Sequence, residues 1–170
     1  RMVNIMSLQK TLEYNKIVED ILTHEEFLKL QHELHHGISR FEHSKRVSVV
    51  TFNLCKKLHL DAERVTRAAL LHDFYTDSDT TLYNARETLK KHPEIALNNA
   101  CEYFDIDEVQ KDIIEKHMFP ATKELPSYKE SFLVSMVDKA VAAHEMYRFK
   151  LSMYLGIFVV FVCNILAIQK

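Results

Sequence analysis

Residues 61–74 read DAERVTRAALLHDF, and this stretch decides the fold expected of the chain. Its apolar residues recur at helical intervals, and Asp61 carries the kind of side-chain oxygen that caps helix N-termini. The helix runs into the pair His72-Asp73 directly after the apolar residues 68–71. Polar groups delivered from such a run need partners, because an unpaired buried polar group costs free energy. The stretch therefore predicts a helix that carries a functional pair into the protein interior.

The same helical spacing of apolar side chains recurs along most of the chain. Proline suits the first turn of a helix, so we expect one helix to start at His92-Pro93. Ser39 is the expected N-cap of another helix, and residues 35–39, 76–81 and 119–127 are expected as loops. The expected helices cover residues 9–34 as two short pieces, 41–58, 61–73, a segment from His92-Pro93, a segment from Asp107 to near His117, and a segment around 132–141.

The composition also favours helices joined by few loops. The 170 residues include only two glycines and three prolines, too few for the many tight turns of a β-sandwich or a Rossmann-like sheet. Apolar residues at 47% and charged residues at 27% are typical of a folded globular protein. No repeat or linker divides the chain. We therefore expect one all-α domain over residues 1–170.

Charge and cysteine usage narrow the class of protein further. A formal net charge of −2 provides no general basic field, so nucleic acid is not an expected partner. The three cysteines are odd in number and lack metal-type spacing, which fits a reducing compartment. The start of the chain shows no continuous apolar core and no small-residue cleavage site. These features predict a cytoplasmic protein.

Four polar residues in apolar settings indicate a metal site. His43 lies on the helix before His72-Asp73, and Asp138 lies on a later helix whose facing side is otherwise apolar. Two imidazoles and two carboxylates suit iron, manganese, zinc or nickel better than calcium, with magnesium as a further option. A metal with an open position lowers the pKa of a bound water, which then attacks phosphorus as hydroxide. The alternative interpretation is a hydrogen-bonded structural cluster without metal.

The order and spacing of these residues resemble the HD-domain superfamily of metal-dependent phosphohydrolases. The matching pattern, H…HD…D, occurs in RFEHSKRVSVV (His43), AALLHDF (His72 and Asp73) and SMVDKAV (Asp138), over residues 40–144. The resemblance implies an all-α helical bundle whose ligands converge on its interior. It also implies a metal-dependent hydrolase, with Asp73 at the catalytic centre, that cleaves a phosphoester or phosphoanhydride of a nucleotide-like substrate. A non-catalytic nucleotide-binding or sensor module is the alternative.

Two further histidines narrow this resemblance. His92, in LKKHPEIAL, and His117, in IIEKHMFP, lie between the HD pair and Asp138. In HD enzymes with two metals, histidines in these intervals bind a second ion, so the resemblance implies His92 and His117 as ligands and Asp73 as the bridge. The order H…HD…H…H…D is similar to bacterial hydrolases of symmetrical dinucleoside tetraphosphates and to small uncharacterised HD proteins of Gram-positive bacteria. The alternatives are a helix N-terminal residue before Pro93 and a helix C-terminal histidine favoured by the dipole.

This chain lacks the lysine that many relatives carry shortly after the HD pair and that is thought to contact the substrate phosphate. Those relatives continue HD with two residues and a lysine, whereas Thr76 stands at that position here. Arg46 lies three residues after His43 and so shares its helical face, which makes it the candidate catalytic and phosphate-binding cation. Lys139 and Lys116, each adjacent to a proposed ligand, are further phosphate-binding candidates. For all three cations the alternative is a solvated surface charge.

Residues 151–169, LSMYLGIFVVFVCNILAIQ, form an uncharged apolar stretch. We expect a C-terminal helix that packs on the core or at a subunit interface. In the second case, its partner would be another copy of the chain. The alternative is membrane association, because at about 1.5 Å per residue the helix is long enough to cross a bilayer. Arg148 and Lys150 before it and Lys170 after it are flanks compatible with an anchor.

Overall fold

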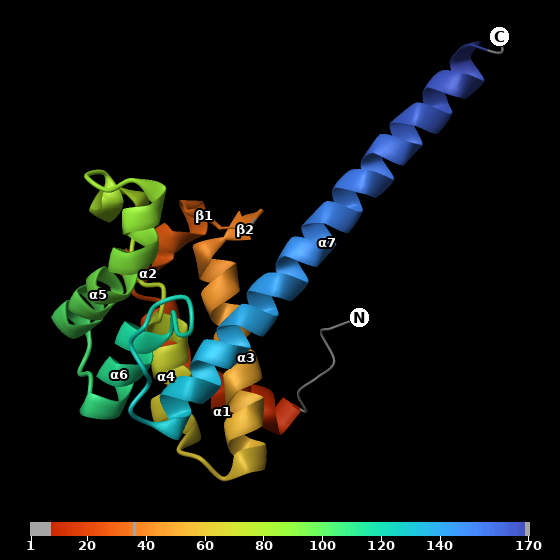
Figure 1. Ribbon diagram of the computed structural model, residues 1–170. Coiled ribbons are helices and arrows are strands. Elements are labelled where there is room, and N and C mark those ends of the chain that lie inside the picture. The colour runs from red at the N-terminus through yellow and green to blue at the C-terminus, as the bar shows by residue number, and fades with distance from the viewer. Residues whose placement is uncertain (1–7, 36, 169–170) are drawn as a thin grey trace.

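The computed structural model describes residues 8–35 and 37–168, with the side chains of 8–34 and 37–157. Within these residues the fold is a helical bundle with one short β-hairpin, whose two strands have two residues each. This architecture confirms the all-α class (Figure 1). The elements in chain order are α1 (Leu8–Leu22), α2 (Glu25–Leu28), η1 (Lys29–His32), β1 (Leu34–His35), β2 (Ile38–Ser39), α3 (Arg40–Leu58), α4 (Ala62–Leu71), η2 (Asp77–Thr80), α5 (Ala85–Tyr103), α6 (Glu108–Lys116) and α7 (Lys129–Ile168).

Three of the predicted helix starts are confirmed by their capping bonds. The side chains of Ser39, Asp61 and Asp107 each accept a hydrogen bond from a backbone N–H in the first turn, at 3.2, 3.1 and 2.9 Å. Such caps satisfy donors that have no partner inside the helix. Local side-chain chemistry therefore sets where α3, α4 and α6 begin.

The start predicted at His92-Pro93 is wrong, because α5 begins at Ala85 and contains Pro93 in its interior. Asn84 and Glu87 form a capping box: the Asn84 side chain accepts from N–H groups of the first turn, and the Glu87 carboxylate accepts from the Asn84 N–H at 3.0 Å. This reciprocal cap starts the helix early. An interior proline removes one helical hydrogen bond, but Pro93 is buried with His92 on the inner face of α5.

The core is built around α4. This helix packs against α3 and α6 and, more lightly, against α1, α5 and α7. Its apolar side chains after the first residue are all fully buried, so the residue after its last turn also lies inside the protein. The burial explains why the pair His72-Asp73 is delivered to the interior. The fully buried apolar residues of α4 are Val65, Ala68, Ala69, Leu70 and Leu71.

Helix α7 is continuous and extends well beyond the bundle (Figure 1). Its first part packs against α3 and α6, and its last part projects away from the other helices. The expected packing of this stretch on the core is wrong for residues 151–157, because no break turns the helix back onto the bundle. The side chains of residues 158–169 lie outside the described part, and the subunit interface stays a prediction. The exposed fractions are 45% for Leu151 and Met153, 64% for Tyr154, 56% for Leu155 and 60% for Ile157.

Within the described residues no helix has the length and apolar character needed to cross a membrane.

Asp112, on α6, ties the last loop and the start of α7 to the bundle. Its Oδ2 atom accepts hydrogen bonds from the Ser127 N–H at 2.9 Å and the Ser131 hydroxyl at 2.6 Å, and Lys116 Nζ lies 2.5 Å from Oδ1. Burial raises the pKa of the Asp112 carboxyl, but the bonds from Lys116, Ser131 and Ser127 outweigh burial and hold that pKa below its ordinary value. The ionised carboxylate therefore stabilises the fold.

Asp112→Asn is expected to lower the free energy of unfolding by about 2 kcal/mol at pH 7, the size of a hydrogen bond to a charged group. A carboxyl whose folded-state pKa is lowered contributes stability above its unfolded-state pKa and loses it as the pH falls through the folded-state value. The difference between variant and wild type should therefore shrink in acid. Denaturant titrations followed by circular dichroism, from pH 7 downward, measure it. Glu115→Gln, exposed on the same helix, is the control, and an equal loss there contradicts the prediction.

Candidate metal centre

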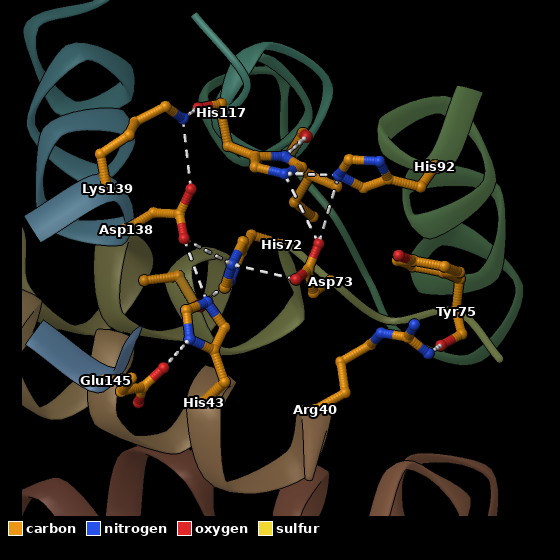
Figure 2. A network of polar contacts seen from close by, with 12 residues as sticks. Arg40, His43, His72, Asp73, Tyr75, His92, His117, Asp138, Lys139 and Glu145 are labelled. Carbon is orange, nitrogen blue, oxygen red and sulfur yellow. Dashed lines mark hydrogen bonds and ion pairs between the residues drawn. The ribbon is translucent and has the colours of Figure 1, made fainter. Parts of the chain in front are cut away.

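The six metal ligands expected from the sequence lie together in the interior of the bundle (Figure 2). They come from α3, the C-terminal ends of α4 and α6, the residue after the cap of α4, the inner face of α5, and α7. All six are buried, which is unusual for ionisable side chains unless they are paired or bind a metal. The exposed fractions are 0% for His43 and His72, 4% for Asp73, 6% for His92, 1% for His117 and 8% for Asp138.

One group of donor atoms surrounds the Asp138 carboxylate. Its Oδ1 atom lies 3.0 Å from His43 Nε2 and 3.6 Å from His72 Nε2. Asp73 Oδ2 lies 3.7 Å from the same His72 nitrogen. Nitrogen and oxygen ligands bind first-row metals at about 2.0–2.2 Å, which spaces neighbouring ligands about 3–3.6 Å apart. The donor atoms of His43, His72 and Asp73 thus satisfy the spacing of ligands of one ion, and Asp138 lies beside two of them.

A second group lies on the other side of Asp73. The Asp73 Oδ1 atom is 3.4 Å from His92 Nε2 and 3.5 Å from His117 Nε2, and the two imidazole nitrogens are 3.0 Å apart. These three side chains also satisfy the spacing for holding a metal ion. Asp73 therefore turns one oxygen toward each group, which is the placement that a carboxylate bridging two ions requires.

Backbone carbonyls orient three of the imidazole rings. His72 and His117 are the C-caps of α4 and α6, and each donates its Nδ1–H to the carbonyl three residues earlier at 2.8 Å. His92 Nδ1 donates to the Thr88 carbonyl at 3.1 Å. The last carbonyls of a helix lack partners within it, so such histidines are well placed to bind them. A proton on Nδ1 leaves the Nε2 lone pair for a metal, and all three Nε2 atoms face the cluster.

Two buried atoms of the cluster have no hydrogen-bond partner among the described residues, namely His72 Nε2 and Asp73 Oδ1. A buried polar atom without a partner costs about 1–3 kcal/mol. Ligation to a cation would satisfy both atoms at once. The donor set, imidazoles with carboxylates, suits a divalent transition metal. The residues present therefore fit a metal centre.

The charge states of Asp73, Asp138, His92 and His117 also suit metal binding. Burial raises the pKa of the Asp73 carboxyl, but the imidazoles of His72, His92 and His117 outweigh burial and hold this pKa below its ordinary value. Burial likewise raises the pKa of Asp138, but the hydrogen bond from His43 and the nearby imidazoles outweigh burial and hold this pKa below its ordinary value. Burial lowers the pKa of His117 to about 3, with help from the nearby imidazoles, and burial also lowers that of His92. Ionised carboxylates and neutral imidazoles are the forms that bind metals.

The comparison with protein families agrees with this geometry. The family model described as HD domain matches residues 40–143, more than half of the chain, and the matched range contains all six cluster side chains. The chain belongs to the HD-domain family. HD domains are typically metal-dependent phosphohydrolases, and the buried cluster of this HD domain fits a metal site. The comparisons with curated proteins and with solved structures found no match.

Glu145 is a residue of this HD domain's site that the sequence analysis missed. Its buried carboxylate accepts from His43 Nδ1 at 2.8 Å and from Arg46 Nη1 at 3.0 Å. Burial lowers the pKa of His43, but the hydrogen bonds with Asp138 and Glu145 outweigh burial and raise that pKa to about 10. The available signal was spacing: Glu145 follows Asp138 by seven residues and so returns to the same helix face.

Arg40 and Tyr75 were missed as well. The Tyr75 ring stacks on His92 with centroids 5.1 Å apart, and the Arg40 guanidinium lies 3.9 Å from the Tyr75 ring centroid. Arg40 Nη1 donates to the Tyr75 carbonyl at 2.9 Å, while Arg40 Nε is buried with no hydrogen-bond partner in the described part of the chain (Figure 2). Arg40 lies three residues before His43, so helical spacing was its signal in the sequence.

The three cations predicted to bind phosphate occupy different places in the HD domain. Lys139 Nζ lies 3.2 Å from Asp138 Oδ2, at the edge of the cluster. Arg46 is half-exposed and pairs with Glu145, not with a metal-ligand candidate. Lys116 pairs with Asp112, which makes its contact structural. The phosphate roles of these residues stay predictions.

We expect the full chain, purified without chelators, to bind about two equivalents of divalent metal, one for each group. The double variant His92→Ala/His117→Ala should bind one, because Asp73 alone remains of the second group. Elemental mass spectrometry on protein of known concentration measures the ratio. His144→Ala, at an exposed position, is the control. One equivalent in the wild type would contradict the second group, and none would contradict the metal centre.

Proposed function

We propose that this HD domain hydrolyses a phosphoester or phosphoanhydride of a nucleotide-like substrate with the help of two divalent metal ions. The observation that carries the proposal is the Asp73 carboxylate, which faces one set of buried ligands with each oxygen. A structural cluster without metal would leave buried atoms of Asp73 and His72 without hydrogen-bond partners.

The ligands divide between the two ions according to the distances between donor atoms. When bound, the ions would supply a water of lowered pKa and would neutralise charge on the reacting phosphate. The chain's own contribution is to hold Asp73 ionised and the imidazoles of His92 and His117 neutral in a buried site. The first ion would be held by His43, His72, Asp73 and Asp138, and the second by Asp73, His92 and His117.

Three basic side chains near the cluster support phosphate as the recognised group. Lys139 lies at the edge of the first set of ligands, and the buried Arg40 lies beside the second, with its Nε unpaired in the described part of the chain. Arg46 lies half-exposed beside His43. These side chains would provide positive charge in place of the lysine that many relatives carry, where this chain has Thr76. Together they support a substrate with more than one phosphate.

The nucleotide part of the proposal rests on the order of the ligands along the chain. The order H…HD…H…H…D is similar to bacterial hydrolases of symmetrical dinucleoside tetraphosphates. Dinucleoside polyphosphates are therefore the first substrates to assay, followed by mononucleotides and cyclic dinucleotides.

Metal-replete wild-type chain is expected to release nucleotide or phosphate from at least one of these three substrate classes. Asp73→Ala should abolish turnover, because it removes a ligand from both groups. The loss should exceed the roughly 10- to 100-fold cost of removing an outer-shell partner of a metal ligand. Chromatography of nucleotides and a colorimetric phosphate assay measure both products. His144→Ala should retain full activity.

Two outcomes would contradict hydrolysis. One is the absence of turnover in all three substrate classes by protein that holds two metal equivalents. The other is tight nucleotide binding by metal-loaded protein without product, which would identify the chain as a non-catalytic binding or sensor module.

A further inference from the structure

Glu145 is a buried carboxylate that lies outside both sets of proposed ligands. It is 4% exposed, and a buried ionised carboxyl is stable only when it is paired and hydrogen-bonded. Its Oε2 atom accepts from His43 Nδ1 at 2.8 Å, and its Oε1 atom accepts from Arg46 Nη1 at 3.0 Å. Both oxygens are therefore engaged, and one of their partners is a proposed metal ligand.

The His43 ring is held at both of its nitrogens by the same helix. Asp138 Oδ1 lies 3.0 Å from His43 Nε2, and Glu145 lies on the Nδ1 side, as Figure 2 shows. Asp138 and Glu145 are seven residues apart on α7, or about two helical turns, so their carboxylates share one face of the helix. When a metal ion replaces the proton on Nε2, a ring that donates Nδ1–H to Glu145 directs its Nε2 lone pair at the first metal group.

This arrangement distinguishes His43 from the other imidazoles of the cluster. The rings of His72, His92 and His117 donate to backbone carbonyls, which are neutral acceptors. His43 instead donates to a carboxylate from another helix. A carboxylate behind a metal-binding histidine fixes the ring and increases its basicity as a ligand. The effect should reach only the group to which His43 belongs.

Arg46 completes the arrangement. It lies one turn after His43 on α3, and its guanidinium holds the Glu145 oxygen that His43 does not use. The half-exposed arginine therefore limits rotation of the buried carboxylate. This contact explains the shared helical face of Arg46 and His43 without requiring Arg46 to touch substrate.

We propose that Glu145, oriented by Arg46, is a positioning residue for His43 and selectively strengthens metal binding by the first group. The proposal rests on the metal centre of the proposed function and adds to it a carboxylate that touches neither metal nor substrate. It predicts that the two metal equivalents respond differently to substitution of one residue.

The positioning role of Glu145 is tested by measuring the affinity of the metal-stripped full chain for Co²⁺. The measurement is a competition titration followed by the visible absorption of the bound ion. Glu145→Ala should weaken one of the two equivalents roughly 10- to 100-fold and leave the other unchanged. Glu145→Gln should retain part of the affinity, because its side-chain carbonyl still accepts from His43. Glu145→Asp keeps the charge but withdraws it by one methylene, and should weaken the same equivalent. Arg46→Ala should do so to a smaller extent, and His144→Ala is the control.

The double variant His92→Ala/His117→Ala isolates the first group. In that background Glu145→Ala should weaken the single remaining Co²⁺, which assigns the effect to the correct ion. Unchanged affinity there, or equal weakening of both ions in the wild-type background together with a lower melting temperature, overturns the proposal. A wild-type chain that binds no Co²⁺ overturns it as well. If Arg46→Ala raises KM for substrate without changing Co²⁺ affinity, the role given to Arg46 is wrong.

The failure of this proposal is separable from that of the proposed function. A wild type that binds two Co²⁺ ions but hydrolyses no substrate contradicts the hydrolase and leaves the response to Glu145→Ala as the deciding measurement. An active wild type whose Co²⁺ affinities are unaffected by Glu145→Ala contradicts the positioning role alone.

Discussion

The burial of the Asp73 carboxylate among imidazoles is the constraint on which the rest of the structure depends. A charge inside the protein is stable only where cations or hydrogen-bond donors compensate it. The imidazoles around Asp73 turn Nε2 lone pairs toward it, so a bound metal ion would provide this compensation. His72, His92 and His117 lie 3.4–3.7 Å from its oxygens and come from three different helices. The packing of α4, α5 and α6 and the charge balance of the site therefore depend on each other.

Helix α7 links this interior site to the outer surface of the molecule. It carries Asp138 and Glu145 two turns apart, so a single helix contacts both ring nitrogens of His43. The same helix continues without interruption into residues 151–157, whose apolar side chains are exposed. Exposed apolar surface of this kind marks sites of contact with proteins or membranes, and the subunit interface expected of this segment stays a prediction.

Much of the fold and of the candidate site could be predicted, because the relevant signals are local. The all-α class follows from apolar spacing and scarce glycine, and the starts of α3, α4 and α6 follow from Ser39, Asp61 and Asp107. The start of α5 could not be predicted from Pro93 alone. A reciprocal cap at Asn84 and Glu87, nine and six residues before Pro93, competes with the preference of proline for a first turn.

The sequence by itself determined the helical class, the family resemblance and the ligand types, since these depend on residue chemistry and on spacing along one element. Only the tertiary structure decided that Asp73 turns one oxygen toward each ligand group, that Glu145 lies behind His43, and that Arg40 and Tyr75 border the second group. Apart from the adjacent pair His72-Asp73, these relations join residues 17 to 102 positions apart. Their cause is the packing of one helix against another, which no local spacing encodes.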